Sequence, residues 1–161
     1  MSSAQMAVLD TNIVLDLFLF QDPQSAALRE QVQSGLLRWI ATQHMRNELE
    51  RVLTYEHITT KLAFYQKSAQ DILADFDRHA QLTAAPPSKA PYTCKDADDQ
   101  PFIDLACHLA LATPVGTVSL FSKDKAVLSL RKRLEKLSIL VRKASFDRRH
   151  LTNLSGANFC D

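Results

Sequence analysis

The sequence predicts an α/β fold in which a mostly parallel sheet carries helices on both faces. Short apolar runs of strand length alternate along the chain with longer segments whose apolar residues recur every three or four positions. Strands that alternate with helices are joined by right-handed crossovers and form parallel sheets. The length of 161 residues lies within the range of about 100–200 residues for one domain, so we expect a single domain over 1–161.

The individual elements follow from apolar spacing and capping signals. The predicted strands are 6–9, 36–41, 117–122 and 139–141. The predicted helices are 13–19, 22–35, 42–55, 57–80, 98–112 and 126–134, and the segment 57–80 is either one long helix or two short ones. The proline-rich stretch 84–91 is expected to be a loop inside the domain, because its prolines lack donors and hold the backbone extended. The segment 146–161 is a tail with no assigned element.

The composition excludes several classes of protein. Hydrophobic residues make up 46% and charged residues 23% of a chain with only 3 Gly and 6 Pro, which rules out collagen-like and low-complexity sequences. The apolar runs are shorter than the ~20 residues of a membrane span, and no secretory signal opens the chain, so we expect a cytoplasmic protein. The three cysteines match neither a disulfide framework nor a zinc site and are expected to be reduced thiols.

Positive charge is concentrated late in the chain. Residues 1–122 carry a net charge of −5, whereas residues 123–149 carry +7. A basic segment of this kind suits a protein that holds a polyanion, although a charge run can also be a solvated helix face. If the partner is a nucleic acid, the residues expected to contact its phosphates are Lys123, Lys125, Arg131, Lys132 and Arg133.

Acidic residues stand where ligands collect in parallel sheets, outside the carboxyl ends of the strands. Asp10 closes the strand 6–9 and Asp124 follows the strand 117–122, so their carboxylates face one crevice if these strands are neighbours. Asp98 and Asp99 begin the helix 98–112, whose N-terminus should point at the same edge. Glu48 lies on the helix 42–55 and borders its buried stripe. These residues are therefore the candidates for a shared site.

Converging carboxylates repel one another unless a cation lies between them. An all-oxygen ligand set suits Mg²⁺ or Mn²⁺, and one or two such ions activate water for attack on phosphorus. Asp10, Glu48, Asp98, Asp99 and Asp124 are the candidate metal ligands. Each acid also has a structural alternative: Asp10 and Asp98 or Asp99 as helix caps, Asp124 as a turn residue, and Glu48 as a partner of Arg46 or Arg51.

The sequence lacks the motifs that other catalytic chemistries require. The sequence has no glycine-rich phosphate loop, and Asp10-Thr11-Asn12 lacks the second aspartate of an aspartyl phosphatase. The histidines are scattered without metal or triad spacing, so they are expected to be surface or core residues.

Four short motifs in order resemble the PIN-domain family, especially its branch of toxin components of toxin–antitoxin pairs (VapC-like). The motifs are Val8-Leu9-Asp10-Thr11-Asn12, Asn47-Glu48-Leu49-Glu50-Arg51-Val52-Leu53, Cys94-Lys95-Asp96-Ala97-Asp98-Asp99 with Phe102 and Ala106, and Phe121-Ser122-Lys123-Asp124-Lys125 with Leu128. The resemblance spans about residues 6–141. The long helical stretch and proline-rich loop before Cys94 depart from the family pattern.

The resemblance implies a Rossmann-like fold with a five-stranded parallel sheet and an Mg²⁺- or Mn²⁺-dependent ribonuclease. Asp10, Glu48 and Asp124 match the first, second and fourth family acids, and Asn12 and Ser122 match the polar residues that support them. Spacing from Ala106 favours Asp99 as the third acid; Asp98 is an alternative and Asp96 a more distant one. The resemblance also implies a homodimer and an antitoxin partner. The alternative is a non-catalytic RNA-binding or protein-interaction module of the same fold.

Overall fold

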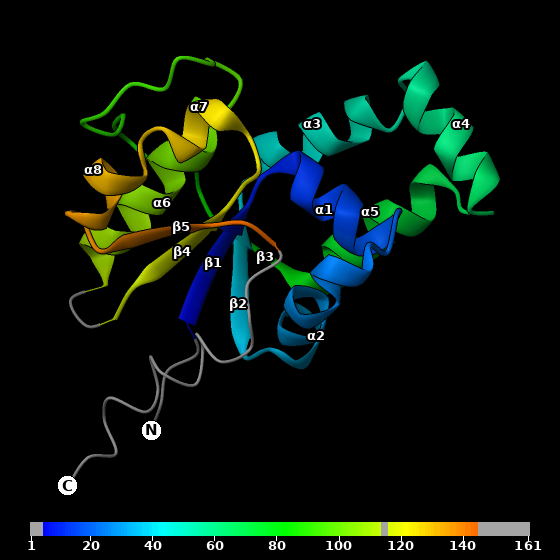
Figure 1. The fold of residues 1–161 in the computed structure, drawn as a ribbon, viewed down its shortest axis with the longest axis horizontal. Helices are drawn as coiled ribbons and strands as arrows, with labels where there is room; N and C mark the ends of the chain where they lie inside the picture. Colours follow the sequence, from blue (N-terminus) through cyan, green and yellow to red (C-terminus); the bar gives the residue numbers. More distant parts are fainter. Residues whose placement is uncertain (1–4, 114–115, 145–161) are drawn as a thin grey trace, which may run out of the picture.

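A parallel five-stranded sheet organises the molecule (Figure 1). The computed structural model describes residues 5–113 and 116–144, so the predicted tail 146–161, Arg148, Arg149 and Cys160 lie outside the described residues. The strands are β1 (Gln5–Leu9), β2 (Leu37–Ala41), β3 (Ala80–Leu82), β4 (Val118–Phe121) and β5 (Ile139–Arg142). Their order is β3-β2-β1-β4-β5, and every pairing is parallel. The five-stranded parallel sheet is therefore confirmed.

The position of β1 in the middle of the sheet brings the two predicted acid-bearing strand ends together. Leu9 at the end of β1 pairs with Phe121 at the end of β4. The backbone N–H of Asp10 then donates to the carbonyl of Phe121 at 3.1 Å, which extends the pairing by one residue. The residues that follow β1 and β4 consequently leave the sheet side by side.

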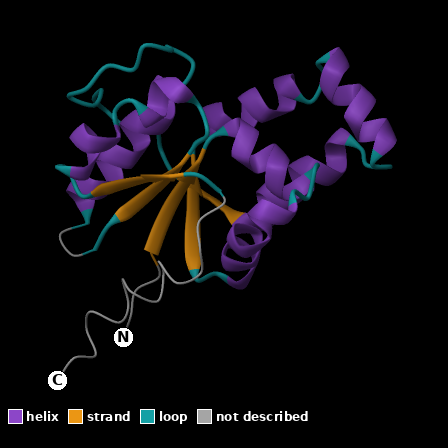
Figure 2. Cartoon of the chain, viewed as in Figure 1, coloured by secondary structure: helices purple, strands orange, loops and turns teal. Residues whose placement is uncertain are grey.

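Helices cover both faces of the sheet, as predicted for a doubly wound fold (Figure 2). One side carries α1 (Thr11–Phe18), the 3₁₀ turn Pro23–Ser25, α2 (Ala26–Ser34), α3 (Gln43–Val52), α4 (Glu56–Phe64) and α5 (Ala69–His79). The other side carries α6 (Gln100–Ala112), α7 (Lys125–Leu128) and α8 (Arg131–Glu135). No described helix is long and apolar enough to span a bilayer.

The core consists of the apolar strand residues and the inward faces of these helices. Residues of β1 and β4 are buried almost throughout, because a parallel strand between two helical layers has no solvent-facing side. Trp39 of β2 packs edge-on against Phe76 of α5 with ring centroids 4.9 Å apart, and stacks on Phe18 of α1 at 6.1 Å. Cys94 and Cys107 are buried free thiols.

Two predicted helices are divided in the structure. The segment 57–80 forms α4 and α5, the two-helix alternative, and a capping box between Ser68 and Asp71 starts the second helix. The prediction that helix extends to residue 80 is wrong, since Ala80–Leu82 pairs with β2 as an edge strand. The prediction of one helix over 126–134 is also wrong. Ser129 and Leu130 separate α7 from α8, and the Ser129 hydroxyl donates to the carbonyl of Ala126.

Candidate functional site

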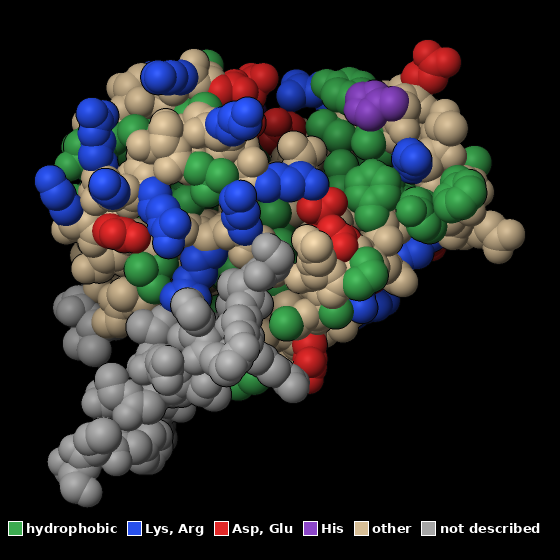
Figure 3. Space-filling model, viewed as in Figure 1, with side chains coloured by type: hydrophobic (Ala, Val, Ile, Leu, Met, Phe, Trp, Pro, Cys, Tyr) green, Lys and Arg blue, Asp and Glu red, His purple; other side chains and the backbone are tan. Residues whose placement is uncertain are grey.

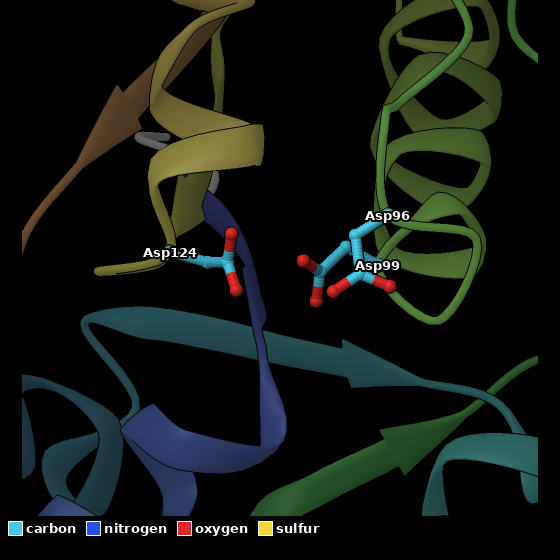
Figure 4. Close-up of side chains that lie close together, drawn as sticks. All are labelled: Asp96, Asp99 and Asp124. Atoms are coloured by element: carbon cyan, nitrogen blue, oxygen red, sulfur yellow. The ribbon is translucent and has the colours of Figure 1, made fainter.

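Four aspartates converge at the carboxyl edge of the sheet. Asp96, Asp99 and Asp124 each offer a carboxylate oxygen, and these oxygens lie within 4.8 Å of one another. Figure 4 shows Asp124 facing Asp96 and Asp99 across a gap, with Asp124 at the start of α7 and the other two before α6. Asp10 lies close enough for electrostatic repulsion with both Asp99 and Asp124. We call these four residues the acid cluster.

Asp10 is the most buried member of the cluster, with only 3% of its surface exposed. One carboxylate oxygen caps α1 by accepting from the backbone N–H of Ile13 at 2.9 Å. The other accepts a hydrogen bond from the hydroxyl of Ser122, which lies directly after β4. The Asp10 side chain therefore caps α1 and also belongs to the acid cluster. Ser122 holds the second carboxylate oxygen of Asp10 in a fixed position.

Asp124 is held by the turn that leads from β4 into α7. Its backbone N–H donates to the Ser122 hydroxyl oxygen at 3.1 Å, and its own carboxylate accepts from the backbone N–H of Ala126 at 2.8 Å. Ser122 thus contacts both Asp10 and Asp124.

The segment before α6 places Asp99, rather than Asp98, in the acid cluster. Asp99 is the N-cap residue of α6 but makes no capping hydrogen bond with its side chain. Its Oδ2 atom is buried and has no hydrogen-bond partner in the described part of the chain. Asp98 is exposed, and its charge acts on Glu48 instead. Asp96, the distant candidate in the sequence, belongs to the cluster.

Glu48 of α3 is not one of the acids whose oxygens lie within 4.8 Å of one another, and its carboxylate is held by Thr11, which the sequence did not single out. The hydroxyl of Thr11 donates to Glu48 Oε2 at 3.3 Å. Asn12, predicted to support the acids, is exposed on the first turn of α1 and makes no side-chain hydrogen bond within the described residues. The packing of α1 against α3 decides which neighbour of Asp10 faces Glu48, and no pattern in the sequence carries that information.

Burial and mutual repulsion raise the pKa of three of these acids, Asp10, Glu48 and Asp99. Burial raises the pKa of Asp10 to about 6, against the opposing effect of the hydrogen bonds from Ser122 and Ile13. Burial and the nearby charge of Asp124 raise the pKa of Asp99 to about 7. Burial also raises the pKa of Glu48. A cation among these groups would relieve the repulsion, and the unpartnered Oδ2 of Asp99 suits a hard divalent cation such as Mg²⁺ or Mn²⁺.

Most of the predicted phosphate-binding residues lie on an exposed basic surface. Lys125, Arg131, Lys132 and Arg133 are exposed on α7 and α8, and Figure 3 shows Lys and Arg side chains gathered over this side of the molecule. Arg131 pairs with Glu135 at 3.5 Å, and the Arg133 guanidinium lies 6.0 Å from the Tyr92 ring centre. Lys123 differs from the others, because its ammonium group pairs with the buried Asp16 of α1 at 2.8 Å.

The sequence matches a known protein family. The sequence matches the family model described as PIN domain over residues 6–112, more than half of the chain. No curated protein is significantly similar to the chain. The matched segment contains Asp10, Glu48, Asp96 and Asp99 but ends before Asp124. The parallel pairing of β1 with β4 supplies that fourth acid.

Proposed function

The chain belongs to the PIN-domain family, and from this premise we propose that it is a metal-dependent endoribonuclease that hydrolyses RNA phosphodiesters. PIN domains are generally nucleases, so a nucleic-acid substrate follows from the family. The observation that carries the finer proposal is the group of Asp96, Asp99 and Asp124 with oxygens within 4.8 Å, beside the buried Asp10. Such a group has the donor atoms that Mg²⁺ and Mn²⁺ prefer.

The residues have distinct proposed roles. Asp10, Glu48, Asp99 and Asp124 are the proposed catalytic acids and would hold the ion, with Asp96 as a further ligand. When bound, a divalent ion lowers the pKa of water and offsets the charge that develops on the leaving oxygen. Ser122 and the N–H of Ile13 fix the carboxylate of Asp10, and Thr11 orients Glu48. These hydrogen bonds hold the carboxylates in place before substrate arrives.

The basic surface supports an RNA substrate. Lys125, Arg131, Lys132 and Arg133 follow directly after the strand that ends at the acid cluster, so phosphates bound there would lie near the acids. The resemblance of the motifs to the toxin branch extends the proposal to a growth-inhibiting role in the cytoplasm, with an antitoxin protein as partner and a homodimer as the active assembly. Expression should then slow growth, and an Asp10→Asn variant should not.

The test is cleavage of single-stranded and structured RNAs with Mg²⁺, with Mn²⁺ and with chelator. The parent is compared with Asp10→Asn and Asp124→Asn, which remove charge while nearly preserving shape. Asp75→Asn on α5, away from the strand ends, is the matched control. We expect metal-dependent cleavage that both site variants lose and the control retains. A folded parent that binds RNA but cleaves none of these substrates would favour the non-catalytic module.

A further inference from the structure

A cavity of about 300 Å³ lies between the proline-rich loop and the first turns of α3 and α6. Three segments distant in sequence build it, and none of its lining residues belongs to the acid cluster. The lining residues that matter here are Thr42, the N-cap of α3, His44 of α3, Pro86, Pro87 and Lys89 of the loop, and Pro101 and Asp104 of α6. We call this cavity the proline pocket.

The proline pocket adjoins the acid cluster through both helices. His44 precedes Glu48 by one turn of α3, so the two side chains share a helix face and interact electrostatically. On α6, Pro101 lies two residues after Asp99. Each helix thus carries a residue of the pocket close in sequence to a candidate catalytic residue, four positions apart on α3 and two positions apart at the start of α6. The pocket therefore shares both helices with residues of the candidate site.

The walls of the pocket suit a flat ring with few charges. Proline rings present apolar surface and carry no backbone N–H that would need a partner. The polar lining side chains, which include His44, Lys89 and Asp104, come from separate segments, so a bound ring would meet apolar walls and several polar groups at its edge. A volume of about 300 Å³ is at the lower end for such sites and fits one nucleoside.

Asp104 supplies the pocket with a fixed hydrogen-bond acceptor. Its Oδ1 atom accepts from the backbone N–H of Ala90 and from Nε2 of Gln100, both at 2.8 Å. These two bonds fix the carboxylate between the proline-rich loop and α6. Its Oδ2 atom receives no hydrogen bond from any residue that the structure describes, and it is therefore available to a ligand.

We propose that the proline pocket binds one unpaired base of the RNA substrate beside the cleaved phosphodiester, and that Asp104 selects cytosine over uracil. The inference rests on the proposed ribonuclease function and adds a specificity site to it. Cytosine presents an amino group that can donate to Oδ2, whereas uracil presents a carbonyl oxygen at the same position and would face the carboxylate with another acceptor. Sequence-specific proteins read unpaired RNA bases by such contacts on the base edges.

The test titrates cytidine and uridine at millimolar concentrations into the protein without metal, and follows the backbone amide resonances of His44, Ser88 and Lys89 by NMR. We expect cytidine to bind at least about fivefold more tightly than uridine. In Asp104→Asn, the amide oxygen can keep the contacts to Ala90 and Gln100, and the amide nitrogen replaces Oδ2 with a donor. The preference should therefore reverse toward uridine, while Asp75→Asn leaves it unchanged.

A second measurement separates this inference from the proposed function. Oligoribonucleotides that differ by one cytosine-to-uracil change are compared for cleavage by the parent and by Asp104→Asn. Cleavage without any cytosine preference, together with equal nucleoside binding or no shifts at the pocket amides, overturns the base site and leaves the nuclease in place. Cytidine binding that reverses in Asp104→Asn supports the base site even if no RNA is cleaved, a result that would instead count against the nuclease.

Discussion

The position of Asp10 has two opposing effects on the stability of the folded protein. Its carboxylate caps α1, which stabilises the helix, yet it is almost fully buried next to other acids. Burial of a carboxylate without a cation favours the protonated form. At neutral pH the ionised carboxylate of Asp10 therefore destabilises the folded chain without metal. Either a proton or a bound cation removes this unfavourable effect.

This argument predicts how the stability of the metal-free chain depends on pH. The folded pKa of Asp10 is raised from 3.8 to about 6, so the folded state binds the proton more tightly than the unfolded state. The resulting stability is fully present below the unfolded pKa and is lost as pH rises through about 6, a cost of about 3 kcal/mol. In chelator, Asp10→Asn should be more stable than the parent at pH 7.5, and the advantage should shrink toward pH 4.

Denaturant unfolding of both proteins at the two pH values measures this difference. Asp75→Asn is the control, because the loss of this carboxylate should not alter the pH dependence of the free energy of unfolding in this way. Mn²⁺ should raise the unfolding midpoint of the parent more at pH 7.5 than at pH 5, because protons compete with the metal for the carboxylates. An advantage of Asp10→Asn that is the same at all pH values would contradict the assigned burial effect.

Thr11 provides a second prediction at the level of single side chains. Thr11→Val removes the hydroxyl that donates to Glu48 but nearly preserves the shape of the side chain. We expect metal affinity to fall by about tenfold, because partners that orient metal ligands typically contribute that much. Calorimetric titration with Mn²⁺ measures the affinity. Thr59→Val, on the exposed surface of α4, should leave it unchanged; an equal loss in both variants would remove Thr11 from this role.

At the scale of elements, the positions of the strands were more predictable from the sequence than the boundaries of the helices. Apolar runs bounded by turn residues identified β1, β2, β4 and β5, because buried parallel strands are continuously hydrophobic. The strand β3 was missed because three residues that follow a helix give no periodic signal. Its pairing with β2 depends on tertiary contacts.

The residues of the candidate site were likewise only partly predictable from the sequence. Asp10 and Asp124 could be predicted to meet because each follows a strand, and the carboxyl ends of neighbouring parallel strands share one edge. Thr11 and Asp96 could not be selected in this way, because their positions depend on how α1 packs on α3 and how the loop before α6 turns. Sequence patterns thus located the edge of the sheet, and side-chain packing determined which polar residues line it.

Gly35 tests an element boundary directly. It ends α2 with φ of +81°, a left-handed conformation, and a Cβ placed there would have no neighbouring atom within 4 Å. Gly35→Ala should therefore cost about 1 kcal/mol of stability for conformational reasons alone. Chemical denaturation measures the cost, and Gln33→Ala in the same helix is the control. A neutral Gly35→Ala substitution would show that the backbone relaxes to another helix end.

For the whole molecule, the basic surface on α7 and α8 predicts the salt dependence of RNA binding. Each phosphate contact that is lost should reduce the slope of log affinity against log salt by about 0.7 for single-stranded RNA. Lys125→Ala combined with Lys132→Ala should weaken binding and flatten this slope by about 1.4 if both lysines contact phosphates. Titrations at several salt concentrations measure it. Lys61→Ala on α4 is the control, and an unchanged slope in the double variant would place RNA elsewhere.

The central position of β1 has a consequence for the timing of synthesis. Strand β1 is translated before the other described strands and lies in the middle of the sheet, and its neighbour β4 is made much later. Asp10 and its partner Ser122 are separated by 112 positions in the sequence. During translation of these 112 positions, a nascent chain therefore holds Asp10 without the residues that complete the cluster. The site can assemble only after Ser122 and Asp124 have been translated.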